Sequence, residues 1–206
     1  QIYTANSVVG TIDPDTNENE LQYYLAQALS IRAFDYFVLA QMYQHTYKGH
    51  ESALCVPLIT NENANEAAAN GCARATVQEV YDQIMADLNK AITLLETTTK
   101  TRGNDKRYIS KEVAHGLRAR VNLTMQNWSA AAADAQKAIE GSGAPYSRDE
   151  VSKPGFTESS DHSWMWAIVI AETDRVVTSG IVNFASHMGS LNYGYASVGA
   201  WRMINK

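Results

Sequence analysis

Hydrophobic residues recur every three or four positions over long parts of this chain, which is the spacing of one face of an α-helix. The first such stripe runs from about residue 18 to residue 43 and contains Leu21, Leu25, Ala28, Ile31, Phe34, Val38 and Met42. A second stripe follows Thr76 and Glu79, whose T-x-x-E spacing is that of a capping box, and continues to about residue 96. Neither helix can bury its stripe alone, so we expect helices over 18–43 and 76–96 to pack against each other.

Residues 110 to 141 carry the signals of a helical hairpin in order. Ser110 can cap a first helix, and Ser129 can cap a second one after a turn at Asn127 and Trp128. Gly141 stands where the second helix should end. The first helix has an apolar stripe at Ala114, Leu117, Val121 and Met125, and the second has small residues at Ala131, Ala135 and Ala138. This arrangement predicts a tetratricopeptide-like unit, whose period is about 34 residues.

Three positions of the hairpin depart from the tetratricopeptide pattern. Arg118, Asn122 and Gln126 stand where that pattern prefers a leucine, an aromatic residue and a glycine. We therefore expect the unit to belong to a larger domain rather than to a regular repeat array.

The connection between the first two predicted helices, residues 46–75, is long and polar, and it contains a strand-like run at 56–60. A connection of this length inside a helical domain is usually functional. Cys55 and Cys72 flank its polar part, so we expect them to lie close together. Their spacing leaves open whether they are two buried thiols or a disulfide.

The composition changes after Gly141. Glycine and proline mark loops over 143–155, residues 164–170 read as a buried strand, and serine, glycine, asparagine and tyrosine dominate the rest. The predicted fold class is therefore mainly α. Tetratricopeptide-like hairpins occupy 1–141 with the insertion at 46–75, and a loop-rich region with little strand follows at 142–206.

Charge and hydropathy exclude two classes of protein. The 206 residues carry a net charge of -5, and the 17 Lys and Arg residues are scattered, whereas nucleic-acid binding needs a clustered positive face. No apolar run approaches the roughly 18 residues of a membrane-spanning helix. The abrupt first and last residues indicate a fragment or a processed product.

The sequence contains none of the common catalytic or metal-binding motifs. The chain has no nucleophile elbow and no phosphate-binding glycine loop, and its five histidines include no H-E-x-x-H or other close ligand pair. Alternating oxygen donors at 13–19 resemble a calcium loop, but Glu18 and Tyr24 stand where that loop needs glycine and glutamate. We expect no enzyme activity, no cofactor and no metal site.

Aromatic residues are the remaining candidates for ligand binding. Tyr193, Tyr195 and Trp201 lie among glycines and polar residues, where a loop can present rings that stack on the apolar faces of sugars. Packing inside the domain is the alternative for these rings, and it is the expected role of Trp166 in its apolar run.

The order of several motifs resembles the SusD/RagB family of outer-membrane glycan-binding lipoproteins. The resemblance covers about residues 2 to 140 and rests on Ala5-Asn6 with Val8-Val9, Ala28 with Ile31–Leu39 and Tyr43, Val56-Pro57-Leu58, Arg74–Tyr81 with Asp87-Leu88, and Arg118–Leu123 with Trp128. Residues 164–168 fit a later strand of that family.

The resemblance implies a function that the residues alone do not. Members of the family are non-catalytic, lipid-anchored proteins of the cell surface that bind an oligosaccharide or a similar nutrient and deliver it to a TonB-dependent outer-membrane transporter. They are usually more than twice this length, so the lipid anchor and part of the ligand site are expected to lie outside the chain. The alternative is a tetratricopeptide-like scaffold that binds a peptide or protein in a concave helical groove lined with Asn, Lys and Arg, without sugar recognition.

Overall fold

The computed structural model describes residues 1–153, 158–169 and 173. The backbone divides into two compact units, residues 1–167 and residues 168–206. Nearly all of the second unit lies outside the described residues, so the fold described below is that of the first.

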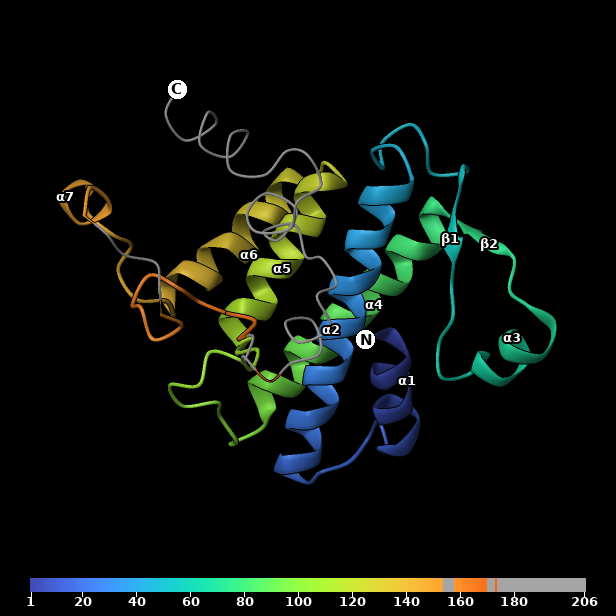
Figure 1. The fold of residues 1–206 in the computed structure, drawn as a ribbon, viewed down its shortest axis with the longest axis horizontal. Coiled ribbons are helices and arrows are strands. Elements are labelled where there is room, and N and C mark those ends of the chain that lie inside the picture. Colours follow the sequence, from blue (N-terminus) through green and yellow to red (C-terminus); the bar gives the residue numbers. More distant parts are fainter. Residues whose placement is uncertain (154–157, 170–172, 174–206) are drawn as a thin grey trace. The chain divides into compact units, whose positions relative to one another are not determined.

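Three helices of this unit pack together. They are α1 (Ile2–Thr11), α2 (Asn19–Tyr43) and α4 (Val77–Thr97). The long α2 packs along α4 over most of its length, and α1 packs on α2 (Figure 1). The predicted pairing of the helices over 18–43 and 76–96 is confirmed.

The predicted hairpin is also present, as α5 (Lys111–Thr124) and α6 (Trp128–Glu140). The Ser110 side chain accepts a hydrogen bond from the Val113 amide, so this cap is confirmed. The predicted Ser129 cap is wrong, because α6 begins two residues earlier than that cap implies, and Asn127 is its N-cap residue without a side-chain bond.

The insertion has more structure than its polar sequence indicates. Strand β1 (Leu54–Pro57) pairs antiparallel with β2 (Arg74–Thr76), and the helix α3 (Ala64–Asn70) lies between them. The strand-like run was predicted at 56–60, two residues too late. Thr76 ends β2 and forms the predicted capping box with Glu79, so one residue both closes the ribbon and starts α4.

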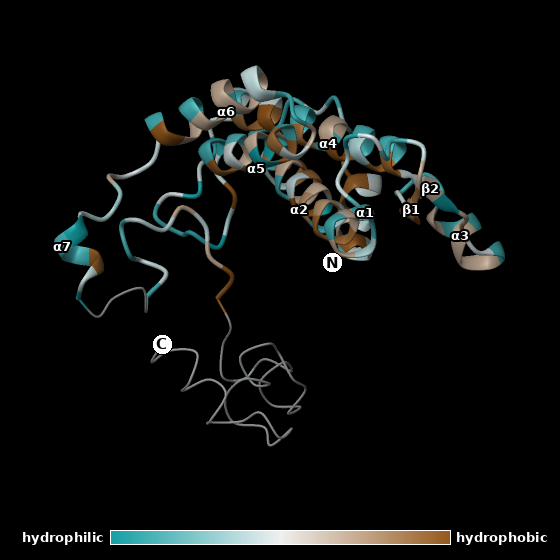
Figure 2. Ribbon diagram, turned by 90° about the horizontal axis from the view of Figure 1, so that it is seen from above, coloured by the Kyte–Doolittle hydropathy of each residue, from teal (hydrophilic) through white to brown (hydrophobic). Residues whose placement is uncertain are grey.

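The hydrophobic core lies between α2, α4, α5 and β1. Its largest fully buried side chains include Tyr36, Ile84, Leu88 and Ile109. A second, smaller cluster joins α2 to the end of α4 around Leu25. Figure 2 shows hydrophobic residues along α1, α2 and α5, while α7 (Arg148–Val151) is mostly hydrophilic.

The predicted buried strand at 164–170 is wrong for its described part, because residues 164–169 form no strand. Residues up to Ala167 instead dock on the loop that precedes α5. The Ala167 amide donates to the Lys106 carbonyl at 3.0 Å, and the Trp166 ring meets Phe34 edge-on with centroids 5.3 Å apart. Trp166 therefore packs, as expected, while Ile168 is 66% exposed.

Candidate functional site

The three predicted ligand-binding residues, Tyr193, Tyr195 and Trp201, lie outside the described residues. Their role remains a prediction. Within the described residues, a large concave surface lies elsewhere, between the insertion and the helices α1 and α2.

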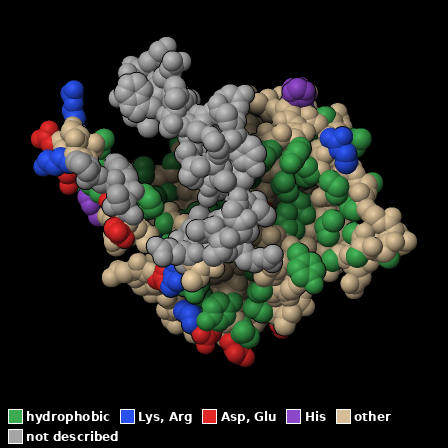
Figure 3. All heavy atoms as spheres, in the orientation of Figure 1, with side chains coloured by type: hydrophobic (Ala, Val, Ile, Leu, Met, Phe, Trp, Pro, Cys, Tyr) green, Lys and Arg blue, Asp and Glu red, His purple; other side chains and the backbone are tan. Residues whose placement is uncertain are grey.

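This surface, which we call the insertion hollow, has a volume of about 1090 Å³. Figure 3 shows hydrophobic side chains gathered over the region between α1 and the β1–α3 segment. The lining is mostly apolar or aromatic and comprises Ile2, Tyr3, Asn6, Tyr36, Leu39, Tyr43, Cys55, Val56, Pro57, Ile59, Ala64, Asn65, Ala67, Ala68 and Arg74. None of these lining residues is acidic, so the hollow carries one positive charge and no negative charge.

The base of the hollow is held in place by hydrogen bonds to Ile59, directly after β1. The Tyr36 hydroxyl donates to the Ile59 carbonyl at 2.7 Å and accepts from the Ile59 amide at 2.8 Å. The Asn6 side chain donates to the same carbonyl at 2.9 Å. One residue of α1 and one residue of α2 therefore position the chain at this end of the insertion.

Behind this contact lies a buried ion pair. Arg32 of α2 donates two hydrogen bonds of 2.7 Å to the Asp87 carboxylate of α4. Its remaining terminal nitrogen donates to the side-chain oxygens of Asn6 and Asn61, at 2.9 and 3.0 Å. The guanidinium thus joins α1, α2, α4 and the insertion at one point.

Two tyrosine rings stand on the walls of the hollow with their faces available to a ligand. Tyr3 of α1 is 82% exposed and Tyr43 at the end of α2 is 62% exposed. Asn65 of α3 and Arg74 of β2 supply polar groups from the insertion. Arg74 also donates to the carbonyls of Leu54 and Cys55 and so closes the irregular stretch of the β1–β2 ribbon.

Both cysteines are free thiols, Cys55 buried and Cys72 half-buried, so the structure has no disulfide between them, and their expected closeness stays a prediction. Cys55 is buried beneath the hollow, and its burial raises the pKa of the thiol. A neutral buried thiol is a poor nucleophile. The Cys72 thiol donates to the carbonyl of Leu58, the residue after β1, at 3.7 Å.

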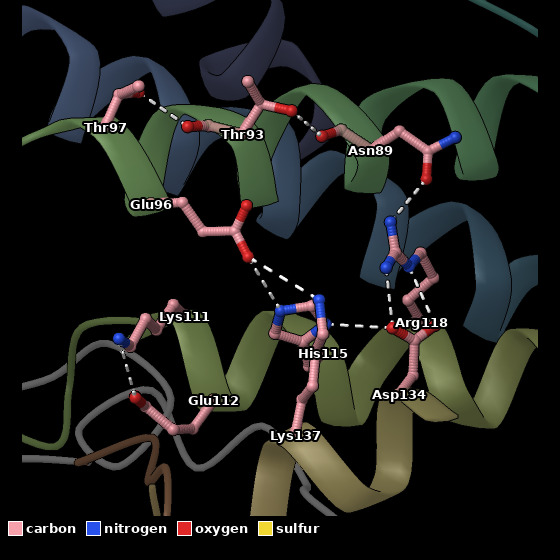
Figure 4. Close-up of polar contacts among 10 residues, drawn as sticks. All are labelled: Asn89, Thr93, Glu96, Thr97, Lys111, Glu112, His115, Arg118, Asp134 and Lys137. Carbon is pink, nitrogen blue, oxygen red and sulfur yellow. Dashed lines mark hydrogen bonds and ion pairs between the residues drawn. The ribbon is translucent and has the colours of Figure 1, made fainter. Parts of the chain in front are cut away.

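A second concave site is polar and lies where α4, α5 and α6 end or begin. It has a volume of about 300 Å³ and is lined by Glu96, Lys111, Glu112, His115, Lys137, Glu140 and Gly141. Figure 4 shows the His115 ring between two carboxylates. Its Nδ1 lies 2.9 Å from Asp134 and its Nε2 lies 3.4 Å from Glu96.

The Asp134 carboxylate is the centre of this polar cluster. It accepts from Arg118 at 2.6 and 2.8 Å and from Asn122 at 3.2 Å. Burial opposes ionisation, but the bonds from Arg118 and His115 outweigh it and lower the pKa of Asp134. His115, Arg118 and Asp134 are thus paired with one another, and the first two also with α4, which indicates a structural role.

Across the described residues, no group of three or more His, Cys, Asp or Glu side chains is arranged to hold a metal ion. In the same part of the chain, no helix has both the length and the hydropathy needed to cross a membrane.

The fold and the hollow define a mainly α-helical protein with tetratricopeptide-like hairpins and a ligand-sized concavity. Residues 1–123 match the family model described as "Starch-binding associating with outer membrane", SusD-like. The chain belongs to this SusD-like family. Among curated proteins, none matches significantly.

Solved structures agree with this assignment. A SusD-like carbohydrate-binding protein from Bacteroides vulgatus is 28% identical, with a TM-score of 0.71 over 80% of this chain and 34% of the other. A laminarin-binding SusD-like protein is 27% identical, with a TM-score of 0.53 over 70% of this chain and 29% of the other. A SusD superfamily protein from Bacteroides thetaiotaomicron, 23% identical, shares the fold, with a TM-score of 0.60 over 73% of this chain and 32% of the other. The chain thus spans about a third of the length of these structures.

The sequence did not single out Tyr3, Tyr43, Asn65 and Arg74 as binding residues. The available signal was the long insertion at 46–75, which was expected to be functional. Because the walls of the hollow come from segments far apart in sequence, no local motif marks it.

Proposed function

We propose that this protein binds an oligosaccharide or a similar nutrient without catalysis, and that the insertion hollow takes part in binding. One observation carries the proposal: two exposed tyrosine rings, Tyr3 and Tyr43, stand over a hollow that also presents amide and guanidinium donors. Sugar rings have apolar C–H faces and polar edges, so aromatic faces and a few convergent donors match them.

Delivery to a TonB-dependent outer-membrane transporter, and attachment to the cell surface through a lipid anchor, belong to the same proposal. They are supported by the family description, which combines starch binding with outer-membrane association. Two of the similar solved structures, a carbohydrate-binding and a laminarin-binding protein, support the ligand class. We propose no enzyme activity, because the buried thiol and the paired His115 offer no activated nucleophile with a free base.

The test is calorimetry of the protein with laminarin and starch oligosaccharides. Changing both Tyr3 and Tyr43 to alanine removes two stacking faces worth about 1 kcal/mol each by analogy with aromatic pairs, so affinity should fall roughly 30-fold. Trp128→Ala is the matched control, because Trp128 is 60% exposed on α6, away from the residues that line the hollow.

A parallel variant with alanine at Tyr193, Tyr195 and Trp201 tests the site predicted from the sequence. Loss of affinity in this variant alone would move the site there. Unchanged affinity of the Tyr3 and Tyr43 double variant, in a protein with a wild-type melting temperature, would remove the insertion hollow from the proposal.

One observation favours the alternative of a protein-binding scaffold. A shallow apolar groove of about 470 Å³ runs between α5 and α6, with Leu123, Trp128 and Ile139 exposed beside small residues. Its lining contains one charged residue, Arg120, and therefore differs from the Asn-, Lys- and Arg-rich groove expected for that function. Binding of a peptide, lost in Trp128→Ala and kept in the tyrosine double variant, would support the alternative.

A further inference from the structure

Two histidines of the insertion lie face to face at the end of α2. The ring centroids of His45 and His50 are 5.0 Å apart and their planes are tilted by 33°. His45 is exposed and His50 is half-buried, so both can be reached from solvent. No close ligand pair was recognised in the sequence, because the two residues lie in a polar loop five positions apart.

The hydrogen bonds of His50 prepare one ring nitrogen for a ligand. Nδ1 lies 3.0 Å from the Thr46 carbonyl oxygen, which can only accept, so Nδ1 carries the proton. In the neutral ring, Nε2 is then left as a free acceptor. A metal-binding histidine typically donates its other ring nitrogen to a carbonyl in this way, which fixes the tautomer and the orientation of the ring.

The His45 ring has no competing partner among the described residues. Its backbone amide donates to the Gln44 side chain at 2.7 Å, and its imidazole lies beside the His50 ring. In the part of the chain that the structure describes, no hydrogen bond therefore competes for the His45 ring nitrogens or for His50 Nε2.

The distance between the rings suits a shared ion. With a zinc–nitrogen bond of about 2.0–2.1 Å, the centroid of a bound imidazole lies roughly 3.2 Å from the metal. Two such rings at a tetrahedral angle have centroids roughly 5 Å apart, close to the observed separation. Four residues separate the two histidines, a spacing within the H-x₃₋₅-H range of zinc-binding histidine pairs.

We propose that His45 and His50 form a two-histidine site for a divalent transition-metal ion of the zinc, nickel or copper type. Neutral imidazole is a ligand suited to these ions, and water would complete the coordination. The neighbouring charges nearly cancel, because Lys48 lies 3.8 Å from the Glu51 carboxylate.

The site would connect the end of α2 to the chain that enters β1. The His50 carbonyl accepts from the Ala53 amide at 2.9 Å, and the Gln44 side chain donates to the Leu54 carbonyl at 2.6 Å. A bound ion would tie these two segments together beside Tyr43, on one wall of the insertion hollow.

The test is titration of the untagged protein with zinc chloride in a calorimeter, with magnesium chloride as a hard-cation comparison. The variants are His45→Ala and His50→Ala. His162→Ala is the matched control, since each variant keeps four of the five histidines and His162 is exposed. We expect one zinc ion per chain, at least ten-fold weaker binding in each of the first two variants, and wild-type binding in the control.

A second measurement follows the melting temperature of the protein instead of the heat of zinc binding. Zinc should raise the melting temperature of the wild type and of His162→Ala, because it binds the folded state, and should leave the other two variants unchanged. The proposal is overturned if the wild type does not bind zinc, if either His45→Ala or His50→Ala binds it as the control does, or if magnesium binds equally well.

Discussion

The hydroxyl group of Tyr36 shows how much one residue can position in this protein. It bonds both backbone groups of Ile59 and thereby holds the insertion against α2. Burial raises the pKa of this phenol, so the group stays neutral and keeps its proton for the Ile59 carbonyl.

Changing Tyr36 to phenylalanine should destabilise the protein by about 1–3 kcal/mol, because the Ile59 amide loses its partner and the Ile59 carbonyl keeps only the Asn6 side chain. Tyr24→Phe is the control, since its hydroxyl bonds only to the surface side chains of Glu20 and Lys100 among the described residues, and its effect should stay within about 0.5 kcal/mol. Urea unfolding followed by circular dichroism measures both. Equal free energies of unfolding for the two variants would contradict the anchoring role of Tyr36.

Two ion pairs of the same length allow a second comparison between residues. Arg32–Asp87 and Arg107–Asp105 both have N–O distances of 2.7 Å, but the first pair is 4% exposed on each side and the second is 63% and 32% exposed. Arg32→Met should cost about 3–5 kcal/mol, because it leaves the buried Asp87 carboxylate unpaired.

Arg107→Met should cost less than about 1 kcal/mol, because water screens the exposed pair. Thermal unfolding of both variants gives the difference. A small loss for Arg32→Met would show that the Asp87 carboxylate finds another partner, and Gln83, which donates to it at 2.8 Å, is the nearest one available.

At the scale of elements, the helices could be predicted because their stripes and caps are local signals. The stripes over 18–43 and 76–96 and the capping box at Thr76 correspond to α2 and α4. The strand predicted at 164–170 is wrong for its described part, and the reason is physical. A short apolar run predicts that its side chains are buried, but here they are buried by packing on the 98–110 loop rather than by pairing with a strand.

The insertion and its hollow could not be predicted in this way. Strands β1 and β2 pair across an intervening helix of alanines and polar residues, and the hollow needs α1 and α2 as well. Those contacts join residues such as Asn6 and Ile59, which are 53 positions apart. The spacing of hydrophobic residues along the chain carries no information about contacts between such distant positions.

Substitutions of two glycines should change the stability of α5 and of the loop before it in opposite directions. Gly116 lies inside α5, and a Cβ added there would meet the Ala138 Cβ at 3.7 Å, an ordinary contact. Gly116→Ala should therefore stabilise the protein by about 0.5–1 kcal/mol through helix propensity. Gly103 has a φ of +58° in the loop before α5, so Gly103→Ala should destabilise by about 1–2 kcal/mol. Melting temperatures that shift in the same direction would refute this reading.

At the scale of the whole unit, the buried tyrosines of the core limit the alkaline pH at which the fold stays stable. Burial raises the pKa of Tyr81 to about 12, and it also raises the pKa of Tyr36 and Tyr47. In the unfolded chain tyrosine ionises near pH 10. Between these values the unfolded state loses protons that the folded state keeps, so stability is complete below pH 10 and falls as the pH rises towards 12.

Tyr81→Phe removes one of these phenols while keeping its ring in the core. Unfolding in urea at several values between pH 9 and pH 12 should show a shallower loss of stability for the variant, by up to about 2 kcal/mol at the alkaline end. Identical slopes for the variant and the wild type would mean that the Tyr81 hydroxyl reaches solvent.

The polar cluster around Asp134 accounts for two departures of the hairpin from the tetratricopeptide pattern, since Arg118 and Asn122 both bond to that carboxylate. Replacing any one member leaves the other buried polar groups without a partner and lowers stability. Replacing all of them with apolar residues of similar volume can leave stability unchanged. In evolutionary terms the cluster is an epistatic unit. A lineage that restores leucine at position 118 should also have lost the aspartate at 134. If the repeat consensus is restored one position at a time, the intermediate variants should be less stable than either the present hairpin or the full consensus hairpin.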